Sequence, residues 1–123
     1  MKIVATTSAP QAIGPYSQAI IVNDLVFTSG QIALKPDGSF LEGDVEAQTT
    51  QVLENLQAVL KEAGSSLQKV VKTTIFLANM DDFAKVNGVY GSFFGDHKPA
   101  RSTVGVKTLP RNALVEIEAI AAK

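Results

Sequence analysis

Two segments with helical spacing of apolar residues flank an apolar, β-branched run, and this order restricts the folds open to the chain. Residues 44–63 and 81–94 each carry such a stripe and are followed by Gly64 and Gly95, residues that commonly end helices. Residues 70–78 are dense in β-branched and large apolar side chains, which predicts an interior strand. Helices that alternate with strands imply a sheet with helices packed on one face.

The helical stripes define the predicted core. Asp44 is the expected N-cap of the first helix. The first stripe consists of Val52, Leu53, Leu56, Val59, Leu60 and Ala63, and the second of Phe83, Val86, Tyr90 and Phe93. Asn87 interrupts the second stripe at an inward position. An inward amide has to be hydrogen-bonded, either to the protein or to a ligand.

The remaining strands are predicted in pairs at the two ends of the chain. Residues 19–22 and 25–28 are β-rich and separated by Asn23-Asp24, which favours a tight hairpin. Residues 102–106 and 113–121 form the last two strands, joined by a turn around residues 109–112. The resulting order is β-β-α-β-α-β-β, an α+β class fold in one domain over residues 1–123.

The last strand predicts that the far face of the sheet is covered as well. One set of alternating residues is Val115, Ile117, Ala119 and Ala121, and the other is Leu114, Glu116, Glu118 and Ile120. Both sets contain apolar residues, although two helices can cover only one face. This favours a homo-oligomer that buries the second face.

Composition excludes several classes of function. The formal net charge is -1 and the basic residues are scattered, which argues against a nucleic acid partner or an anionic membrane. Cysteine is absent and His97 is the one histidine, so thiolate sites, disulfides and clustered histidine ligands are excluded. No apolar run approaches the ~20 residues that span a bilayer, and we expect a cytoplasmic protein.

An arginine and a glutamate near the C-terminus are the first candidates for chemistry. Arg101 follows Pro99, which stiffens the approach to the strand, and a guanidinium fits a carboxylate through two parallel hydrogen bonds. Glu116 and Glu118 lie in an otherwise apolar strand, where burial can raise a carboxyl pKa for acid–base work. A surface ion pair for Arg101 and charges that prevent edge pairing for the glutamates remain open alternatives.

Further candidates lie in turns and strand breaks. Tyr16 follows the rigid turn Gly14-Pro15 and is either a core residue or a hydrogen-bond donor to a ligand. Ser29 and Gly30 interrupt a strand, and Gly30 permits close approach of another group to the backbone. His97 lies in a polar loop and is expected to be exposed.

The motifs along nearly the whole chain resemble those of the Rid superfamily, the reactive-intermediate deaminases also called the YjgF family. They include the following segments: A-P-Q-A-I-G-P-Y-S-Q-A (residues 9–19), F-T-S-G-Q-I (27–32), G-D-V-E-A-Q-T (43–49), V-K-T-T-I-F-L (71–77), D-F-A-K-V-N (82–87), P-A-R-S (99–102) and V-E-I-E-A-I-A (115–121). The agreement is collinear and most similar to the archetypal imine-deaminase branch.

This resemblance implies a chorismate-mutase-like (ferredoxin-like) mixed sheet, assembled as a homotrimer with sites in clefts between subunits. It implies hydrolysis of 2-iminobutanoate, 2-iminopropanoate or their enamine tautomers to 2-oxo acids and ammonia. These reactive intermediates arise when pyridoxal-phosphate enzymes dehydrate serine and threonine. No cofactor or metal is expected.

The resemblance also assigns roles by position. Arg101 matches the residue that pairs with the substrate carboxylate, and Glu116 matches the residue that holds the hydrolytic water. The other site-lining positions match Tyr16, Ser29, Gly30, Asn87 and Thr103. Thr103 stands where many members have cysteine, and the loop before Pro99 is shorter than in several relatives.

Two other functions stay open at this point. Some members of the family are credited with endoribonuclease activity and inhibition of translation, which the acidic composition and lack of a basic groove disfavour. A non-catalytic module that binds a small carboxylate and regulates a partner is also compatible, because a fold does not determine a function.

Overall fold

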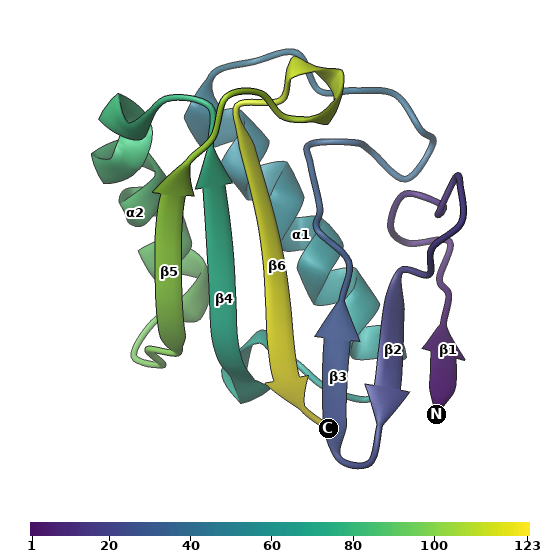
Figure 1. Ribbon diagram of the computed structural model, residues 1–123. Coiled ribbons are helices and arrows are strands. Elements are labelled where there is room, and N and C mark those ends of the chain that lie inside the picture. The colour runs from purple at the N-terminus through teal and green to yellow at the C-terminus, as the bar shows by residue number, and fades with distance from the viewer.

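The computed structural model describes all residues from Met1 to Lys123 as one mixed sheet with two helices on one face (Figure 1). The strands are β1 (Lys2–Val4), β2 (Ala19–Val22), β3 (Leu25–Thr28), β4 (Val70–Leu77), β5 (Ala100–Gly105) and β6 (Val115–Ala122). Their order across the sheet is β1-β2-β3-β6-β4-β5. All neighbours are antiparallel except β4 and β5, which are parallel and connected through the second helix. The predicted α+β class is confirmed.

The first helix, α1 (Val45–Glu62), matches the predicted segment closely. The Asp44 side chain accepts a hydrogen bond from the Ala47 backbone N–H, so the predicted N-cap is confirmed. Gly64 adopts a φ of 82° directly after the helix, a conformation that glycine reaches without steric cost. The apolar stripe of α1 faces the sheet, and its members from Val52 to Leu60 are fully buried.

The second helix, α2 (Phe83–Phe94), follows a short 3-10 turn at Met80–Asp82. Its fully buried residues are Val86, Tyr90 and Phe94, whereas Phe83 and Phe93 of the predicted stripe are half-buried and pack against this core. Phe94 stacks on Tyr90 with ring centroids 4.5 Å apart, because residues four apart lie above one another on a helix.

The two helices and the sheet enclose the main apolar core, while the other face of the sheet stays open. In β6 the residues Val115, Ile117, Ala119 and Ala121 are buried towards the helices. On the open face, Val22, Leu25, Phe27 and Val104 each retain more than a third of their surface. This row of exposed apolar side chains confirms that both faces of the sheet carry apolar residues.

The edge strand β1 was not predicted. The order of strands across the sheet, which the sequence left open, places β4 between the last two strands. The predicted turn between them contains a 3-10 turn at Pro110–Asn112. Neither helix has the length and apolar character that a bilayer-crossing segment requires.

Candidate functional site

Arg101 lies on β5, at the edge of the sheet, and its guanidinium is enclosed by one side of α2. Its Nη1 donates a hydrogen bond of 2.8 Å to the Asn87 side-chain oxygen. The guanidinium carbon lies 5.4 Å from the Phe83 ring centroid and 5.0 Å from the Tyr90 ring centroid. Phe83, Asn87 and Tyr90 follow one another at helical spacing, so a single helix face holds the cation by two aromatic rings and one amide.

The Asn87 side chain thus accepts a hydrogen bond from Arg101, which satisfies the inward amide that the sequence predicted. Arg101 forms no ion pair within the chain, so the alternative of a surface ion pair is wrong. Tyr90 was predicted only as a core residue, although its ring also contacts the arginine. Its hydroxyl is hydrogen-bonded to Thr73 at 2.7 Å. Burial raises the pKa of Tyr90, while the Thr73 hydrogen bond and the charge of Arg101 oppose this shift.

A cavity of about 340 Å³ opens beside Arg101. Its lining residues are Asn87, Tyr90, Gly91, Phe94, Gly95, His97, Lys98 and Arg101. The prediction that His97 is exposed was wrong, because the ring is half-buried and its Nε2 lies 2.6 Å from the Val70 carbonyl oxygen. This contact ties the short loop before β5 to the start of β4.

Glu116 lies on β6 and points to the open face of the sheet. Its carboxylate rests against Gly30, where a Cβ atom would lie 2.9 Å from the Glu116 Cδ. The predicted close approach at Gly30 is therefore confirmed. Burial raises the pKa of the Glu116 carboxyl, and the negative charge of Glu118 raises it further. A carboxyl with a raised pKa is a stronger base when it ionises.

A second cavity, of about 580 Å³, brings Glu116 together with three other predicted site residues. Its polar lining comes from Gln11, Tyr16, Gln18, Ser29, Gly30, Gln31, Arg111 and Glu116, and its apolar lining from Pro10, Ile13, Ile32, Leu34 and Pro110. An apolar cavity with a few convergent polar groups is typical of a small-molecule site.

The segment that bears Tyr16 is held in place by Gln18. The buried Gln18 side chain accepts a hydrogen bond from the Thr6 N–H and donates to the Thr6 and Pro10 carbonyl oxygens. The Tyr16 side chain itself is exposed, so its hydroxyl is not part of the core. Ser29 lines the same cavity as Tyr16, and its hydroxyl donates a hydrogen bond of 2.5 Å to the Ser17 carbonyl oxygen.

Thr103 differs from the other predicted site residues because it lines neither of these two cavities. It lies on β5 two residues after Arg101, opposite Ile75 of β4. Its hydroxyl oxygen is buried and has no hydrogen-bond partner. An unsatisfied buried hydroxyl is uncommon in proteins.

The register of the sheet places Arg101 and Glu116 on opposite faces. Arg101 lies opposite Thr73 of β4, whose hydroxyl reaches Tyr90 on the helix side. Glu116 lies opposite Phe76 of the same strand. Residues three apart on a strand point to opposite faces, so the two cavities open on different sides of the sheet.

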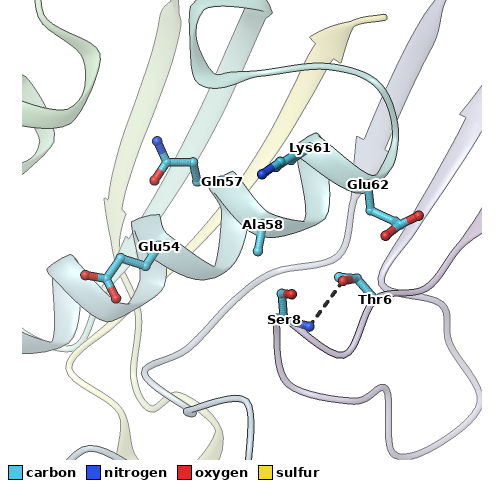
Figure 2. A pocket seen from close by; sticks show the side chains of 7 residues that line it. All are labelled: Thr6, Ser8, Glu54, Gln57, Ala58, Lys61 and Glu62. Carbon is cyan, nitrogen blue, oxygen red and sulfur yellow. Dashed lines mark hydrogen bonds between the residues drawn. The ribbon is translucent and has the colours of Figure 1, made fainter.

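A third hollow, of about 630 Å³, lies between the N-terminal segment and the outer side of α1 (Figure 2). Its lining residues are Thr6, Ser8, Glu54, Gln57, Ala58, Lys61 and Glu62. Figure 2 shows the side chains of α1 spread along the helix, with a hydrogen bond only between Ser8 and Thr6. None of the predicted site residues lies there, so the two smaller cavities remain the candidate site.

Comparisons with known proteins agree with this fold and with the motifs. The family model described as endoribonuclease L-PSP matches residues 6–123. A protein of Pyrococcus abyssi named as a RutC family protein is 50% identical over 99% of this chain and 97% of its own length. The mouse 2-iminobutanoate/2-iminopropanoate deaminase is 48% identical over 98% of this chain and 90% of its own length.

A solved structure extends the likeness to the whole fold. Escherichia coli TdcF, crystallised with bound serine, superimposes with a TM-score of 0.95 and 43% identity, over 100% of this chain and 99% of TdcF. The family match, the identities and the shared fold all cover nearly the full length. The chain therefore belongs to the endoribonuclease L-PSP family, which is the YjgF/Rid family.

Proposed function

We propose that this protein hydrolyses 2-imino acids such as 2-iminobutanoate and 2-iminopropanoate, or their enamine tautomers, to 2-oxo acids and ammonia. The observation that carries this proposal is Glu116, a half-buried carboxylate with a raised pKa that lies against Gly30 in an apolar-lined cavity. Such a group can hold a water molecule and accept its proton near neutral pH. The name of the mouse relative agrees with this chemistry.

Arg101 is the residue that would bind the substrate carboxylate. Asn87 occupies one guanidinium nitrogen, and the rings of Phe83 and Tyr90 fix the plane of the group. The remaining N–H donors of Arg101 are therefore already oriented, so a carboxylate can bind to them with little loss of side-chain conformational entropy. Orientation of this kind is worth up to ~7–11 kcal/mol of barrier for ideally placed groups.

The proposed reaction adds one water molecule to the carbon–nitrogen double bond. Glu116 takes a proton from the water while the water oxygen forms a bond to the imine carbon, and it passes this proton to the nitrogen, which gives a carbinolamine with one hydroxyl and one amino group. Glu116 then takes the hydroxyl proton of the carbinolamine and passes it to the nitrogen as the C–N bond breaks. Ammonia leaves, the carbonyl forms, and the carboxylate of Glu116 is restored.

A second copy of the chain would complete each site. Within one copy the sheet separates Arg101 from Glu116, so a substrate of a few carbon atoms cannot contact both. The exposed apolar residues of the open face, including Leu25 and Phe27, offer a surface for association. We propose a homotrimer in which Arg101 of one copy and Glu116 of another meet in a shared cleft.

Three other residues have supporting roles in this proposal. Tyr16 would orient the nitrogen end of the substrate, because its exposed hydroxyl lines the same cavity as Glu116. Ser29 would shape the cavity wall, since its hydroxyl is already bonded to Ser17. Thr103 would contribute backbone groups beside Arg101, because its side-chain oxygen is buried.

The family description also raises the alternative of RNA cleavage. The formal charge of -1 gives little attraction for phosphate, and the one histidine is bonded to the Val70 carbonyl. These observations favour a small acid over RNA as the substrate. A non-catalytic module that binds carboxylates would account for the restrained guanidinium of Arg101, but it would leave Glu116 without a role.

The test is a coupled assay with threonine dehydratase, in which loss of 2-iminobutanoate and release of ammonia are followed together. We expect the protein to accelerate both above the spontaneous rate, and Glu116→Gln to remove most of this acceleration. Acceleration that survives in Glu116→Gln would assign the base elsewhere. RNA cleavage by nuclease-free protein that disappears in Arg101→Ala would support the alternative instead.

A further inference from the structure

The chain has two arginines, and each lines one of the two cavities of the candidate site. Arg101 lines the cavity beside α2, and Arg111 lines the cavity that contains Glu116. Neither guanidinium forms an ion pair with a carboxylate of the chain: Arg101 bonds to Asn87, and Arg111 lies over a Phe40 ring. Arg111 takes no part in the reaction proposed above.

The backbone at Arg111 is held in an unusual conformation. Arg111 has a φ of 61° and Asn112 a φ of 55°, so two consecutive residues other than glycine adopt left-handed angles. The turn is closed by hydrogen bonds from the Asn112 N–H to the Leu109 oxygen and from the Ala113 N–H to the Pro110 oxygen. Left-handed angles cost free energy for a residue with a side chain, and they persist where the surroundings enforce them.

The side chain of Arg111 is also restrained. Its guanidinium carbon lies 5.6 Å from the Phe40 ring centroid, a distance at which the cation is attracted to the ring. A guanidinium attracted to the face of a ring keeps its N–H donors available to a partner. The cavity next to it is lined in part by the apolar residues Ile13, Ile32 and Leu34.

We propose that Arg111 is a second carboxylate-binding residue, which favours 2-imino acids that carry another carboxylate on the side chain. This inference rests on the proposed function. Arg101 would bind the carboxylate next to the imine carbon, and Arg111 the one at the end of the side chain. Arginine suits both because its fork matches a carboxylate in two parallel hydrogen bonds.

The test compares two substrates that differ in this carboxylate. An amino-acid oxidase forms 2-iminobutanoate from 2-aminobutanoate, and a glutamate oxidase forms 2-iminoglutarate from glutamate. The ratio of kcat/KM for 2-iminoglutarate to that for 2-iminobutanoate is measured in the wild type, Arg111→Gln, Arg111→Lys and Arg111→Gly. Lys107→Gln is the control, because it removes the same charge from an exposed residue that lines neither cavity of the candidate site.

We expect Arg111→Gln and Arg111→Gly to lower the ratio by about 10- to 100-fold, the range for a lost charge-assisted hydrogen bond. Lys107→Gln should leave the ratio unchanged. The ratio for Arg111→Lys should lie between the wild-type ratio and the ratio for Arg111→Gln, because an ammonium group keeps the charge but lacks the planar fork. Glycine adopts left-handed angles without steric cost, so the turn should form correctly in Arg111→Gly. This variant therefore measures the effect of losing the Arg111 side chain alone.

A ratio that does not change in Arg111→Gln and Arg111→Gly would overturn the inference while leaving the proposed function in place. An unchanged ratio together with a lower oligomer mass would assign Arg111 to contacts between copies and would also overturn it. If the wild type accelerates neither substrate, the proposed function fails. Calorimetric titration with 2-oxoglutarate and 2-oxobutanoate then tests Arg111 alone: a preference for 2-oxoglutarate that is lost in Arg111→Gln supports it, and no preference overturns it.

Discussion

Arg101 and Glu116 lie on opposite faces of one sheet, although only β4 separates their strands. Arg101 points to the helix side, where α2 encloses it, and Glu116 points to the open side, against Gly30. This relationship divides the candidate site of one copy into two halves. Each half has its own cavity and its own ionisable group. The proposed function therefore requires the Arg101 half of one copy to lie next to the Glu116 half of another.

Glu116→Gln should lower kcat by about 10²–10⁴-fold, the usual contribution of a general base, with a smaller effect on ligand affinity. In the wild type the acid limb of the pH–rate profile should lie above the ordinary glutamate pKa, because burial and Glu118 raise the pKa of Glu116. Steady-state rates of imine loss between pH 3 and pH 8 on the two proteins measure both effects. An acid limb at or below the ordinary glutamate pKa would contradict the assignment.

The same substitution has a predicted effect on stability with a definite sign. Because the folded-state pKa of Glu116 is raised, the native protein binds more protons than the unfolded chain between the two pKa values, and stability falls as pH rises through that interval. Glu116→Gln removes this loss. At neutral pH the variant should be at least as stable as the wild type, and the difference should vanish below about pH 4.3. Urea denaturation at both pH values measures the comparison, and a less stable variant at neutral pH would show that the carboxylate is held by favourable contacts.

Gly30→Ala should displace the carboxylate of Glu116, since the added methyl group would overlap it. Misplacement of a catalytic group by about 1 Å can cost about 100-fold in rate, so we expect a fall of that order in kcat. Stability should change by less than about 1 kcal/mol, because the end of the glutamate side chain can move. Gly88→Ala in α2 is the matched control, because its methyl group meets nothing within 4 Å. Full activity in Gly30→Ala would show that the position of Glu116 against the backbone is not required.

Asn87→Asp should weaken the binding of small carboxylates by at least about 10-fold. The new carboxylate would lie next to the Arg101 guanidinium and compete with the ligand for it. Calorimetric titration with 2-oxobutanoate measures the affinity, and Gln57→Glu on the exposed side of α1 controls for the change in net charge. Unchanged affinity in Asn87→Asp would indicate that the ligand carboxylate binds away from Arg101.

Phe27→Glu should prevent association of the chain through the open face of the sheet. Phe27 is 39% exposed beside Leu25 and Val22, and a charge at its position cannot be buried without a partner. Analytical ultracentrifugation should give a smaller particle than the wild type, whereas Met80→Glu, an exposed apolar residue outside the sheet, should leave the mass unchanged. A Phe27→Glu protein that keeps the wild-type mass would exclude this face as the interface.

Local patterns were sufficient to predict most of the fold. Asp44, Gly64 and the apolar spacing between them predicted α1, and Asn23 adopts the left-handed turn expected of the β2–β3 hairpin. These features act through neighbours in the sequence, so the sequence reports them directly. The edge strand β1 has only Lys2–Val4 and pairs with a distant segment, which leaves almost no local pattern.

The sequence indicated candidate residues for the site but not how they are arranged. The separation of Arg101 from Glu116 depends on which residue of β4 each one faces, and pairing register cannot be read from either strand alone. His97 was expected to be exposed because its contact, the Val70 carbonyl, lies far away in the sequence. The spacing of Phe83, Asn87 and Tyr90 did contain a signal, since residues at helical intervals share the face that surrounds Arg101.

Mixed oligomers test most directly whether two copies build one site. Arg101→Ala and Glu116→Gln chains, carrying different tags, are expressed together, and oligomers with both tags are purified and assayed with 2-iminobutanoate. Each variant alone should be nearly inactive. Purified mixed trimers should recover about a third of the wild-type rate, because one of the three sites in each such trimer joins an intact Arg101 to an intact Glu116. Mixed oligomers that stay as inactive as the separate variants would contradict a site shared between copies.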